Sequence, residues 1–386
     1  MKRRLYLIGI SLILLVTQTG CWDMKTIQDM NYITAIGFDY KNGHFQVYSQ
    51  MLDFSNVAKQ ETGKTSGAAS VWVGREEGET VSEAYNKLYK TSQQQVFWGH
   101  VSAFVFSDEA LRRGMGKFLD GFARYNETRF KQWVYSTEEP IDRLFAVMPF
   151  FNLSPMASIL AHPEDSYRQH SFIKPVRLYK VIANVREPGN RLMLPSLAIE
   201  REVWKKNNKP DPKLEVSGIH AMNGEDKLEW LSEEQLKGLR WLQEATSRTP
   251  LVVVMDGKKA GSVSIQKPKV KIKPIIHDDQ VSFDIHMKCK AIVTEILIEL
   301  DDETQRKQTE KQIADEVKQT FEIGKAQDVD IYQLEHLVYR KSFADWSRLT
   351  NNGAKPLKAI RIDNVKIDVD LMHSGMYKMR KKHKEY

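Results

Sequence analysis

Residues 281–293 have the sequence Val-Ser-Phe-Asp-Ile-His-Met-Lys-Cys-Lys-Ala-Ile-Val, which is the clearest strand pattern in the chain. Apolar side chains fill every second position, and most positions between them are polar or charged. Because successive side chains of a strand point to opposite faces, this alternation predicts a strand with one buried face. Cys289 belongs to the apolar set, which indicates a small core residue. The alternative, a reactive thiol, has no basic cluster or second cysteine beside it.

The residues after this strand predict an α+β unit around it. A long helix is expected over 301–325, with Ile313, Val317 and Phe321 on one stripe. A closing strand is expected over 365–371. The order strand, strand, long helix, short helix, strand predicts an antiparallel sheet with helices on one face.

The first part of the chain predicts a second sheet. An Asn-Gly pair at 42–43 between two apolar segments is typical of a β-hairpin. Thr80 and Glu83 form a capping box, and Ser107 is placed to cap a further helix. The order β-β-β-α-β-α-β-α indicates helices packed on a mixed sheet. Strands are expected at 32–39, 45–52, 71–73, 96–106 and 130–135, and helices after Thr80, after Ser107 and at 141–147.

The apolar segment 149–160 has two interpretations. It is either a loop on the surface, available to a partner or the membrane, or a loop tucked into the core. Isolated apolar residues are common in loops, which favours the core interpretation.

A polar linker at 203–213 separates this part from a smaller unit. Strands are expected at 214–222 and 228–231, a capping box at Ser232 and Gln235, and a hairpin at 251–265. We therefore predict an α+β protein of three domains, with mixed or antiparallel sheets flanked by helices. The predicted divisions are a signal peptide at 1–20, a lipid-anchored tether at 21–30, and domains at 31–195, 196–265 and 266–386, the last carrying a basic tail.

The N-terminus has the pattern of an export signal. Lys2, Arg3 and Arg4 precede the uncharged segment 5–16, and Cys21 follows a Thr-Gly pair. A bilayer-spanning helix needs about 20 apolar residues, so this segment is too short for one. The cysteine position indicates a bacterial lipobox, whose thiol is acylated and becomes the first residue after cleavage. The alternatives are an ordinary secreted protein or an uncleaved anchor, since the lipobox position usually held by an aliphatic residue is Gln18.

Charge and cysteine content limit the classes of function. Loss of residues 1–20 removes three of the 57 basic residues and leaves 54 against 50 acidic ones. This weak balance does not indicate a nucleic-acid partner. Acylation of Cys21 would leave Cys289 as the one thiol, which excludes an intramolecular disulfide.

The motifs of common enzymes and metal sites are absent from the sequence. The segment Gly63-Lys64-Thr65 lacks the leading glycine of a phosphate-binding loop. His277-Asp278-Asp279 could ligate a cation, but Asp-Asp between two strands is ordinary turn chemistry. The basic tail 378–384 could meet anionic lipid, although a solvated tail is the simpler interpretation. We predict no catalytic residues, no metal and no cofactor.

Short motifs give the chain a resemblance to the Ger(x)C family. It extends from residue 21 to about residue 377, and the order and spacing of the motifs carry it. The motifs are Cys21-Trp22-Asp23, Ala35-Ile36-Gly37-Phe38-Asp39, Gly99-His100, Gly114, Val216-Ser217-Gly218-Ile219, Asp330-Ile331-Tyr332, Trp346 and Gly375.

The resemblance implies the lipoprotein C subunit of a nutrient germinant receptor of spore-forming bacteria. Such a subunit has three α+β domains and works beside two integral membrane subunits, of A and B type, at the spore inner membrane. It carries no catalytic residues, and Cys21 is the lipid attachment site. The alternative is a solute-binding lipoprotein that captures the nutrient itself, which would need two similar lobes around a cleft.

Overall fold

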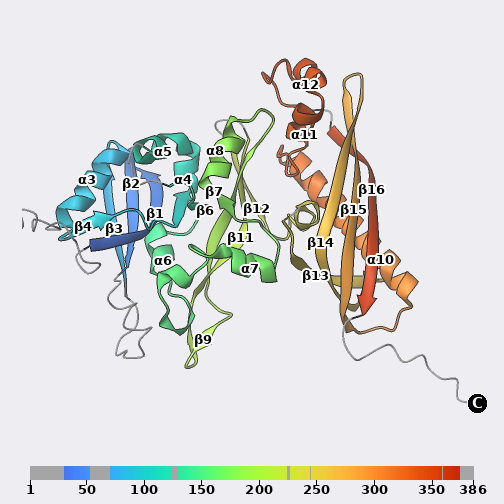
Figure 1. Ribbon diagram of the computed structural model, residues 1–386, viewed down its shortest axis with the longest axis horizontal. Helices are drawn as coiled ribbons and strands as arrows, with labels where there is room; N and C mark the ends of the chain where they lie inside the picture. Colours follow the sequence, from blue (N-terminus) through green and yellow to red (C-terminus); the bar gives the residue numbers. More distant parts are fainter. Residues whose placement is uncertain are drawn as a thin grey trace, which may run out of the picture.

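The described part of the structure, a computed structural model, contains two large β-sheets that stand side by side along the long axis of the molecule, and a separate two-stranded hairpin (Figure 1). The signal peptide, Cys21, the segment 63–65 and the basic tail lie outside the residues it describes. The described residues are 30–52, 70–123, 129–223, 227–243, 245–358 and 360–373.

The larger sheet is mixed, as the sequence predicted. Its interior strand β1 (Met30–Lys41) pairs antiparallel with β2 (His44–Leu52) and parallel with β5 (Ala103–Ser107). Asn42 and Gly43 form the hairpin turn with φ values of 52° and 84°, a region that glycine and asparagine tolerate well. The remaining strands in this sheet are β3 (Val71–Gly78), β4 (Gln95–Phe97), β6 (Trp133–Thr137), β7 (Val176–Arg177), β8 (Leu192–Glu200), β11 (Lys213–Asn223) and β12 (Lys227–Ser232).

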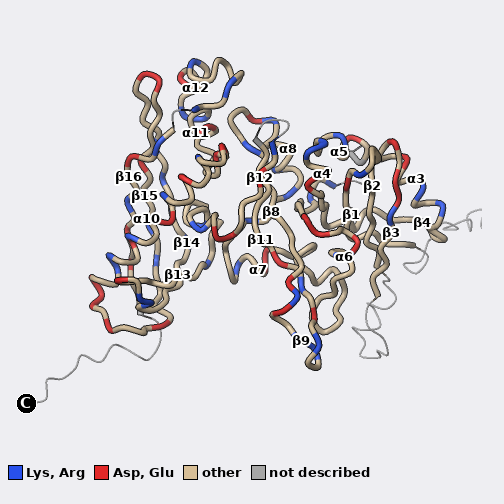
Figure 2. The backbone as a smooth tube through the Cα atoms, turned by 180° about the vertical axis from the view of Figure 1, so that it is seen from behind, with Lys and Arg blue, Asp and Glu red and all other residues tan. Residues whose placement is uncertain are grey.

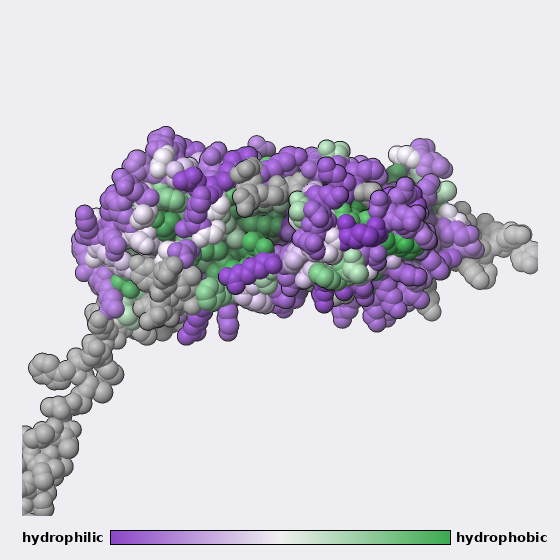
Figure 3. Space-filling view, turned by 90° about the horizontal axis from the view of Figure 1, so that it is seen from above, coloured by the Kyte–Doolittle hydropathy of each residue, from purple (hydrophilic) through white to green (hydrophobic). Residues whose placement is uncertain are grey.

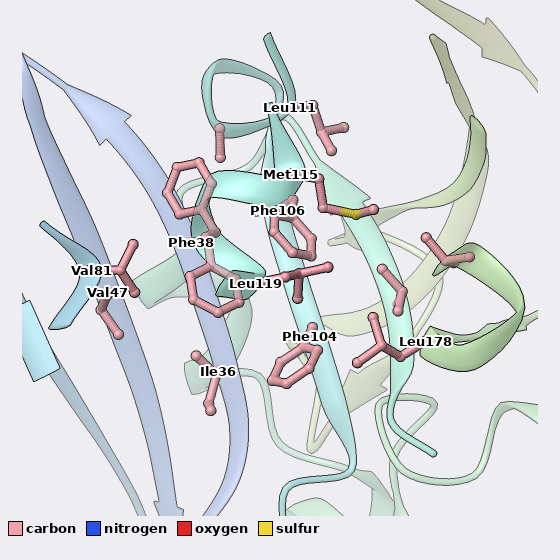
Figure 4. Close-up of a cluster of buried hydrophobic side chains, with 14 of the residues drawn as sticks. Ile36, Phe38, Val47, Val81, Phe104, Phe106, Leu111, Met115, Leu119 and Leu178 are labelled. Carbon is pink, nitrogen blue, oxygen red and sulfur yellow. The ribbon is translucent and has the colours of Figure 1, made fainter. Parts of the chain in front are cut away.

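Helices cover both faces of this sheet. On one face, Phe38, Phe104 and Phe106 from the strands pack against helix residues such as Leu111 and Leu119 (Figure 4). The aromatic stack at its centre has Phe38 and Phe106 with ring centroids 4.9 Å apart. The helices of this face are α3 (Val81–Thr91), α4 (Asp108–Arg113), α5 (Met115–Ala123) and α8 (Leu178–Arg186), and α6 (Ile141–Ala146) packs on the other face.

The predicted caps form. The hydroxyl of Thr80 accepts a hydrogen bond from the amide of Glu83 at 3.1 Å, and Ser107 caps α4 through the amide of Ala110 at 3.0 Å. The predicted single helix after Ser107 is interrupted, because Gly114 has a φ of 104° that ends α4 before α5 begins.

The predicted strand over 96–106 is wrong, since the chain turns between β4 and β5. The amide of Val101 donates to the carbonyl of Trp98 at 3.1 Å, and the indole of Trp98 donates to Tyr89 at 2.8 Å. β4 therefore pairs only with the start of β1. Tertiary contacts of one tryptophan thus override an apolar pattern typical of a strand.

The smaller sheet has the order β13-β14-β15-β16. In β15 all seven apolar positions from Val281 to Val293 are buried, which confirms the predicted alternation. The strands are β13 (Arg248–Met255), β14 (Lys258–His277), β15 (Gln280–Ile296) and β16 (Ile360–His373), and the helices are α10 (Asp302–Ala326), α11 (Leu334–Lys341) and α12 (Phe343–Thr350).

The predicted antiparallel closing strand is wrong, because β16 runs parallel to β15. The reason is visible in Figure 1, where α10 crosses one face of the sheet and α11 and α12 lie at the end where β15 begins. The chain therefore re-enters the sheet in the direction of β15.

The sheets extend across the predicted domain divisions. β11, expected in the middle unit, pairs with β8 of the larger sheet, and β12 joins the same sheet by pairing with β11. β13, expected in the same unit, pairs with β14 in the smaller sheet. The three-domain division remains a prediction, and sheet pairing does not end at residue 195 or at residue 265.

Short elements lie between strands of the larger sheet, and one of them, α9, lies between the two sheets. The predicted polar linker at 203–213 contains a tight hairpin, and the capping box of Ser232 and Gln235 forms on a turn that precedes α9. These elements are η2 (Phe150–Asn152), η3 (Pro155–Ala157), α7 (Pro163–Gln169), β9 (Lys205–Lys206), β10 (Lys209–Pro210) and α9 (Leu239–Leu242).

The apolar segment 149–160 divides between the two interpretations. Pro155 and Leu160 are buried, as the core interpretation requires. Phe150, Phe151 and Leu153 are exposed, so for this half the core interpretation is wrong.

Gly218 supports a close approach between β11 and β12, beside a β-bulge in β11. A Cβ atom there would lie 2.3 Å from the carbonyl oxygen of Leu231, a backbone atom that cannot move aside cheaply. We expect Gly218→Ala to lower the free energy of unfolding by about 1–3 kcal/mol, measured by urea denaturation. Gly116→Ala is the matched control, because its Cβ would meet nothing within 4 Å and alanine favours the helix. Equal effects of the two substitutions would contradict this account.

Candidate functional site

The predicted lipidation site, Cys21, lies outside the described residues, and the described chain begins at the first residue of β1. This corner is tightly packed. Tyr32 meets the ring of Phe97 at 5.7 Å and that of His100 at 5.2 Å between centroids. Asn31 donates to the hydroxyl of Ser92 at 3.0 Å. Any tether joined to Met30 is therefore attached to an interior strand of the larger sheet.

The candidate cation segment 277–279 forms the turn between β14 and β15. The guanidinium of Arg348 donates to the carboxylate of Asp279 at 2.8 Å and to the carbonyl of Asp278 at 2.6 Å. Asp278 and Asp279 thus hold the turn against α12, as ordinary turn chemistry predicts. Among the described residues, no three His, Cys, Asp or Glu side chains converge as a metal site would require.

Cys289 is a core residue, as predicted, and is 6% exposed. Burial, with a smaller contribution from the nearby carboxylates of Glu310 and Asp370, raises the pKa of its thiol to about 12. The thiol is therefore protonated at neutral pH, which disfavours a nucleophilic role.

The most developed polar site lies where the two sheets meet, and its centre is the buried carboxylate of Glu335 on α11. The guanidinium of Arg191, the residue before β8, lies 3.1 Å from this carboxylate. The same carboxylate accepts a hydrogen bond from the amide of Leu357 at 3.2 Å and a longer one from the indole of Trp346 at 3.4 Å. We call Arg191, Glu335, Trp346 and Leu357 the junction network.

Backbone contacts strengthen the junction network. Gln333 has a left-handed φ of 55°, and its side-chain amide accepts from the Arg191 amide at 2.7 Å and donates to the Arg191 carbonyl at 3.2 Å. Asp330 accepts from the amide of Glu335 at 2.8 Å, and burial raises the pKa of Asp330. A Cβ at Gly189 would lie 3.0 Å from the amide nitrogen of His336, so the loop before β8 rests directly on α11.

A second buried ion pair joins the segment between β12 and β13, which we call the connecting segment, to α10. The guanidinium of Arg240 lies 3.0 Å from the carboxylate of Glu316, and these side chains are 6% and 11% exposed. The indole of Trp241 donates to the same oxygen at 2.7 Å, and Arg240 also lies over the ring of Phe172 at 4.4 Å. Because each charge has several partners, the pair avoids the cost of an isolated buried charge.

A cluster of buried apolar side chains also joins the two sheets. Ile219 and Leu231 come from the larger sheet, Leu236 comes from the connecting segment, and Val329 and Ile331 come from the turn after α10. This cluster and the two ion pairs bind the sheets to each other through a packed interface.

Sequence reasoning found only part of this site. Asp330 and Trp346 belong to motifs that carried the resemblance, and the structure brings them to Glu335. Arg191 and Gln333 were missed, because nothing local marks a side chain whose partner lies about 140 residues away. The Pro-Gly pair at 188–189 was the one local signal of a tight approach.

The junction network gives a prediction about stability. Glu335→Ala leaves the partly buried guanidinium of Arg191 without its counter-charge and removes the acceptor of two buried donors, so we expect the free energy of unfolding to fall by about 2–4 kcal/mol. Glu335→Gln keeps the shape and should cost less. The control is Glu303→Ala, whose carboxylate pairs with Lys307 at the surface and should leave stability nearly unchanged. Urea denaturation measures all three, and a loss for Glu335→Ala no greater than that of the control would contradict the role of the network.

Two protein-family models match the chain. A spore germination protein N-terminal domain matches residues 23–199, and a spore germination B3/GerAC-like C-terminal domain matches residues 217–375. The first match begins two residues after Cys21 and ends near the end of β8. The second covers β12, the junction and the smaller sheet.

Individual relatives agree with these models. Spore germination protein KC of Bacillus subtilis is 21% identical over 397 residues, which cover 97% of each chain. Spore germination protein B3 of the same organism is 22% identical and covers 73% of this chain and 72% of its own. The crystal structure of the GerBC protein covers 92% of this chain and 100% of its own, with a TM-score of 0.54 and 16% identity, and shares the fold. The chain therefore belongs to the Ger(x)C family of spore germination proteins, as the order and spacing of its motifs predicted.

Proposed function

We propose that this chain is the lipid-anchored C subunit of a nutrient germinant receptor, and that it assembles with two integral membrane subunits at the extracytoplasmic face of the spore inner membrane. The position of Cys21 carries the proposal. It stands two residues before the segment matched by the N-terminal family model, and it follows a basic head and an uncharged segment. The matched relatives are named as spore germination proteins, which supports a role in germination.

Anchoring would act by confinement. Two acyl chains hold a protein stably at a bilayer, whereas one holds it only marginally. The nine residues from Cys21 to the start of β1 reach at most about 30 Å when extended. The larger sheet would thus remain close to the membrane, at a raised effective concentration beside its partners. No helix in the described ranges is both long and apolar enough to cross a bilayer.

The packing of the molecule supports action through contact. Two of the buried charged groups, those of Glu335 and Arg240, pair with partners that bind the two sheets to each other. The outer surfaces of both sheets and their helices remain available for assembly.

Removal of the acylated thiol tests the anchor. We expect the mature wild-type chain to begin at Cys21 and to carry the added mass of a lipid. The Cys21→Ala chain should lack this lipid and be mislocalised, and spores that contain it should germinate poorly on nutrients. Mass spectrometry, membrane fractionation and germination assays measure these outcomes. Cys289→Ala is the control, because this cysteine lies in the core of the smaller sheet and has no part in anchoring. Normal germination of Cys21→Ala spores, or an unmodified wild-type chain, would contradict the anchor.

Calorimetry separates the receptor subunit from a solute-binding lipoprotein. We expect amino acids and sugars to give no saturable heat with the purified chain alone, because the two sheets differ in size and topology and do not form two similar lobes. Co-purification with the two membrane subunits is the companion measurement. A saturable signal with the chain alone would instead assign nutrient capture to this subunit.

A further inference from the structure

An exposed group of aromatic and aliphatic side chains lies beside the β9–β10 hairpin. Phe151 is 88% exposed, and the other members of the group are between 37% and 69% exposed. We call this group the aromatic patch, and its members are Phe150, Phe151, Leu153, Val203 and Trp204. In Figures 1 and 2 the neighbouring hairpin projects at the lower edge of the molecule.

The structure holds the aromatic patch in a defined geometry. The rings of Phe150 and Trp204 meet edge to face, with centroids 4.9 Å apart. The ammonium of Lys213 lies 4.7 Å from the centroid of Phe150. Phe151 has a left-handed backbone, with φ 59° and ψ 22°, which is unfavourable for a bulky residue and directs its ring outward into water.

The hairpin beside the patch concentrates positive charge. Lys206 and Lys209 lie directly opposite each other in the two-strand register, an arrangement that is destabilising for like charges. Lys206 donates to the side chain of Asn152, which ties the hairpin to the patch at 3.0 Å. In the part of the chain that the structure describes, no carboxylate forms an ion pair with Lys205, Lys206 or Lys209. The nearby carboxylate of Asp211 pairs with Lys213 at 2.7 Å.

We propose that the aromatic patch and the lysines of the β9–β10 hairpin dock on the surface of a bilayer that contains anionic lipid. Tryptophan and phenylalanine favour the depth of the lipid headgroups, and lysines beside them attract anionic phosphates. Anionic lipid would also relieve the repulsion between Lys206 and Lys209. This inference rests on the proposed anchor at Cys21, because a single small patch gives weak membrane affinity without it.

A bilayer suits the patch better than a protein partner does. Its residues project from the fold, whereas protein interfaces place their aromatic anchors in recessed, well-packed pockets. On the opposite side, seen from above in Figure 3, the hydrophobic residues gather mainly in hollows between hydrophilic ones. The lysines supply the charge complementary to phosphate, which a purely apolar protein contact would not need.

The smaller sheet offers a matched negative control. Leu297 is 57% exposed, so it resembles the patch residues in exposure. Acidic residues surround it in sequence, including Glu295, Glu299 and Asp301, and anionic lipid should repel this segment.

The test uses the full lipidated chain on vesicles of phosphatidylcholine with or without phosphatidylglycerol. Phe151→Cys and Leu297→Cys each carry an environment-sensitive dye, and lipids with a quencher near the headgroup report contact. Labelling of the wild-type chain gives the background, because Cys289 is buried and Cys21 is acylated. We expect the dye at 151 to be quenched at least about twofold more than the dye at 297 on phosphatidylglycerol vesicles.

High salt should abolish this difference in quenching. The triple variant Lys205→Glu, Lys206→Glu, Lys209→Glu should also abolish it, while its melting temperature should equal that of the wild-type chain. A chain that floats with the vesicles but shows equal quenching at 151 and 297 overturns the docking and leaves the anchor intact. The docking is also overturned if the difference in quenching between 151 and 297 requires the integral subunits and does not require anionic lipid. A chain that does not float with either vesicle contradicts the anchor, and the docking inference falls with it.

Discussion

The carboxylate of Glu335 holds together parts of the chain that share no strand and no helix. It receives the guanidinium of Arg191 from the larger sheet, the indole of Trp346 from α12 and the amide of Leu357 from the segment before β16. A charge in this position is tolerated only because each of its oxygens has a partner. The two sheets consequently form one body, although strand pairing stops between them.

Local signals in the sequence predicted the local structure well. The hairpin at Asn42-Gly43, the caps at Thr80 and Ser107 and the buried face of β15 depend on neighbours within a few residues, and all are present. Features decided by distant contacts were missed. The segment 203–213 has the polar composition of a linker, and its lysines give no apolar alternation that would indicate the β9–β10 hairpin. The direction of β16 depends on the path of three helices, which periodicity does not report.

The same distinction applies to the site. Cys21 was recognised from a linear pattern and lies outside the described residues, so its role stays a prediction. The motif residues occupy positions that tolerate few other side chains. At Gly218 the backbone of β12 lies too close for a side chain, and Asp330 and Trp346 hydrogen bond to Glu335. This explains why short, separated motifs indicated the family, since each marks a tight contact in the fold. The partners of these residues, such as Arg191, could not be deduced because pairing across the junction depends on the complete fold.

The interior position of β1, with strands on both sides, has a mechanical consequence. A tether joined to Met30 would pull along the axis of a strand that is bonded to β2 on one side and to β4 and β5 on the other. Such a load acts in shear, and both ladders of hydrogen bonds must fail together before the strand can slide. A protein suspended from a membrane by this strand would resist force far better than one held by an edge strand, whose bonds can open one at a time.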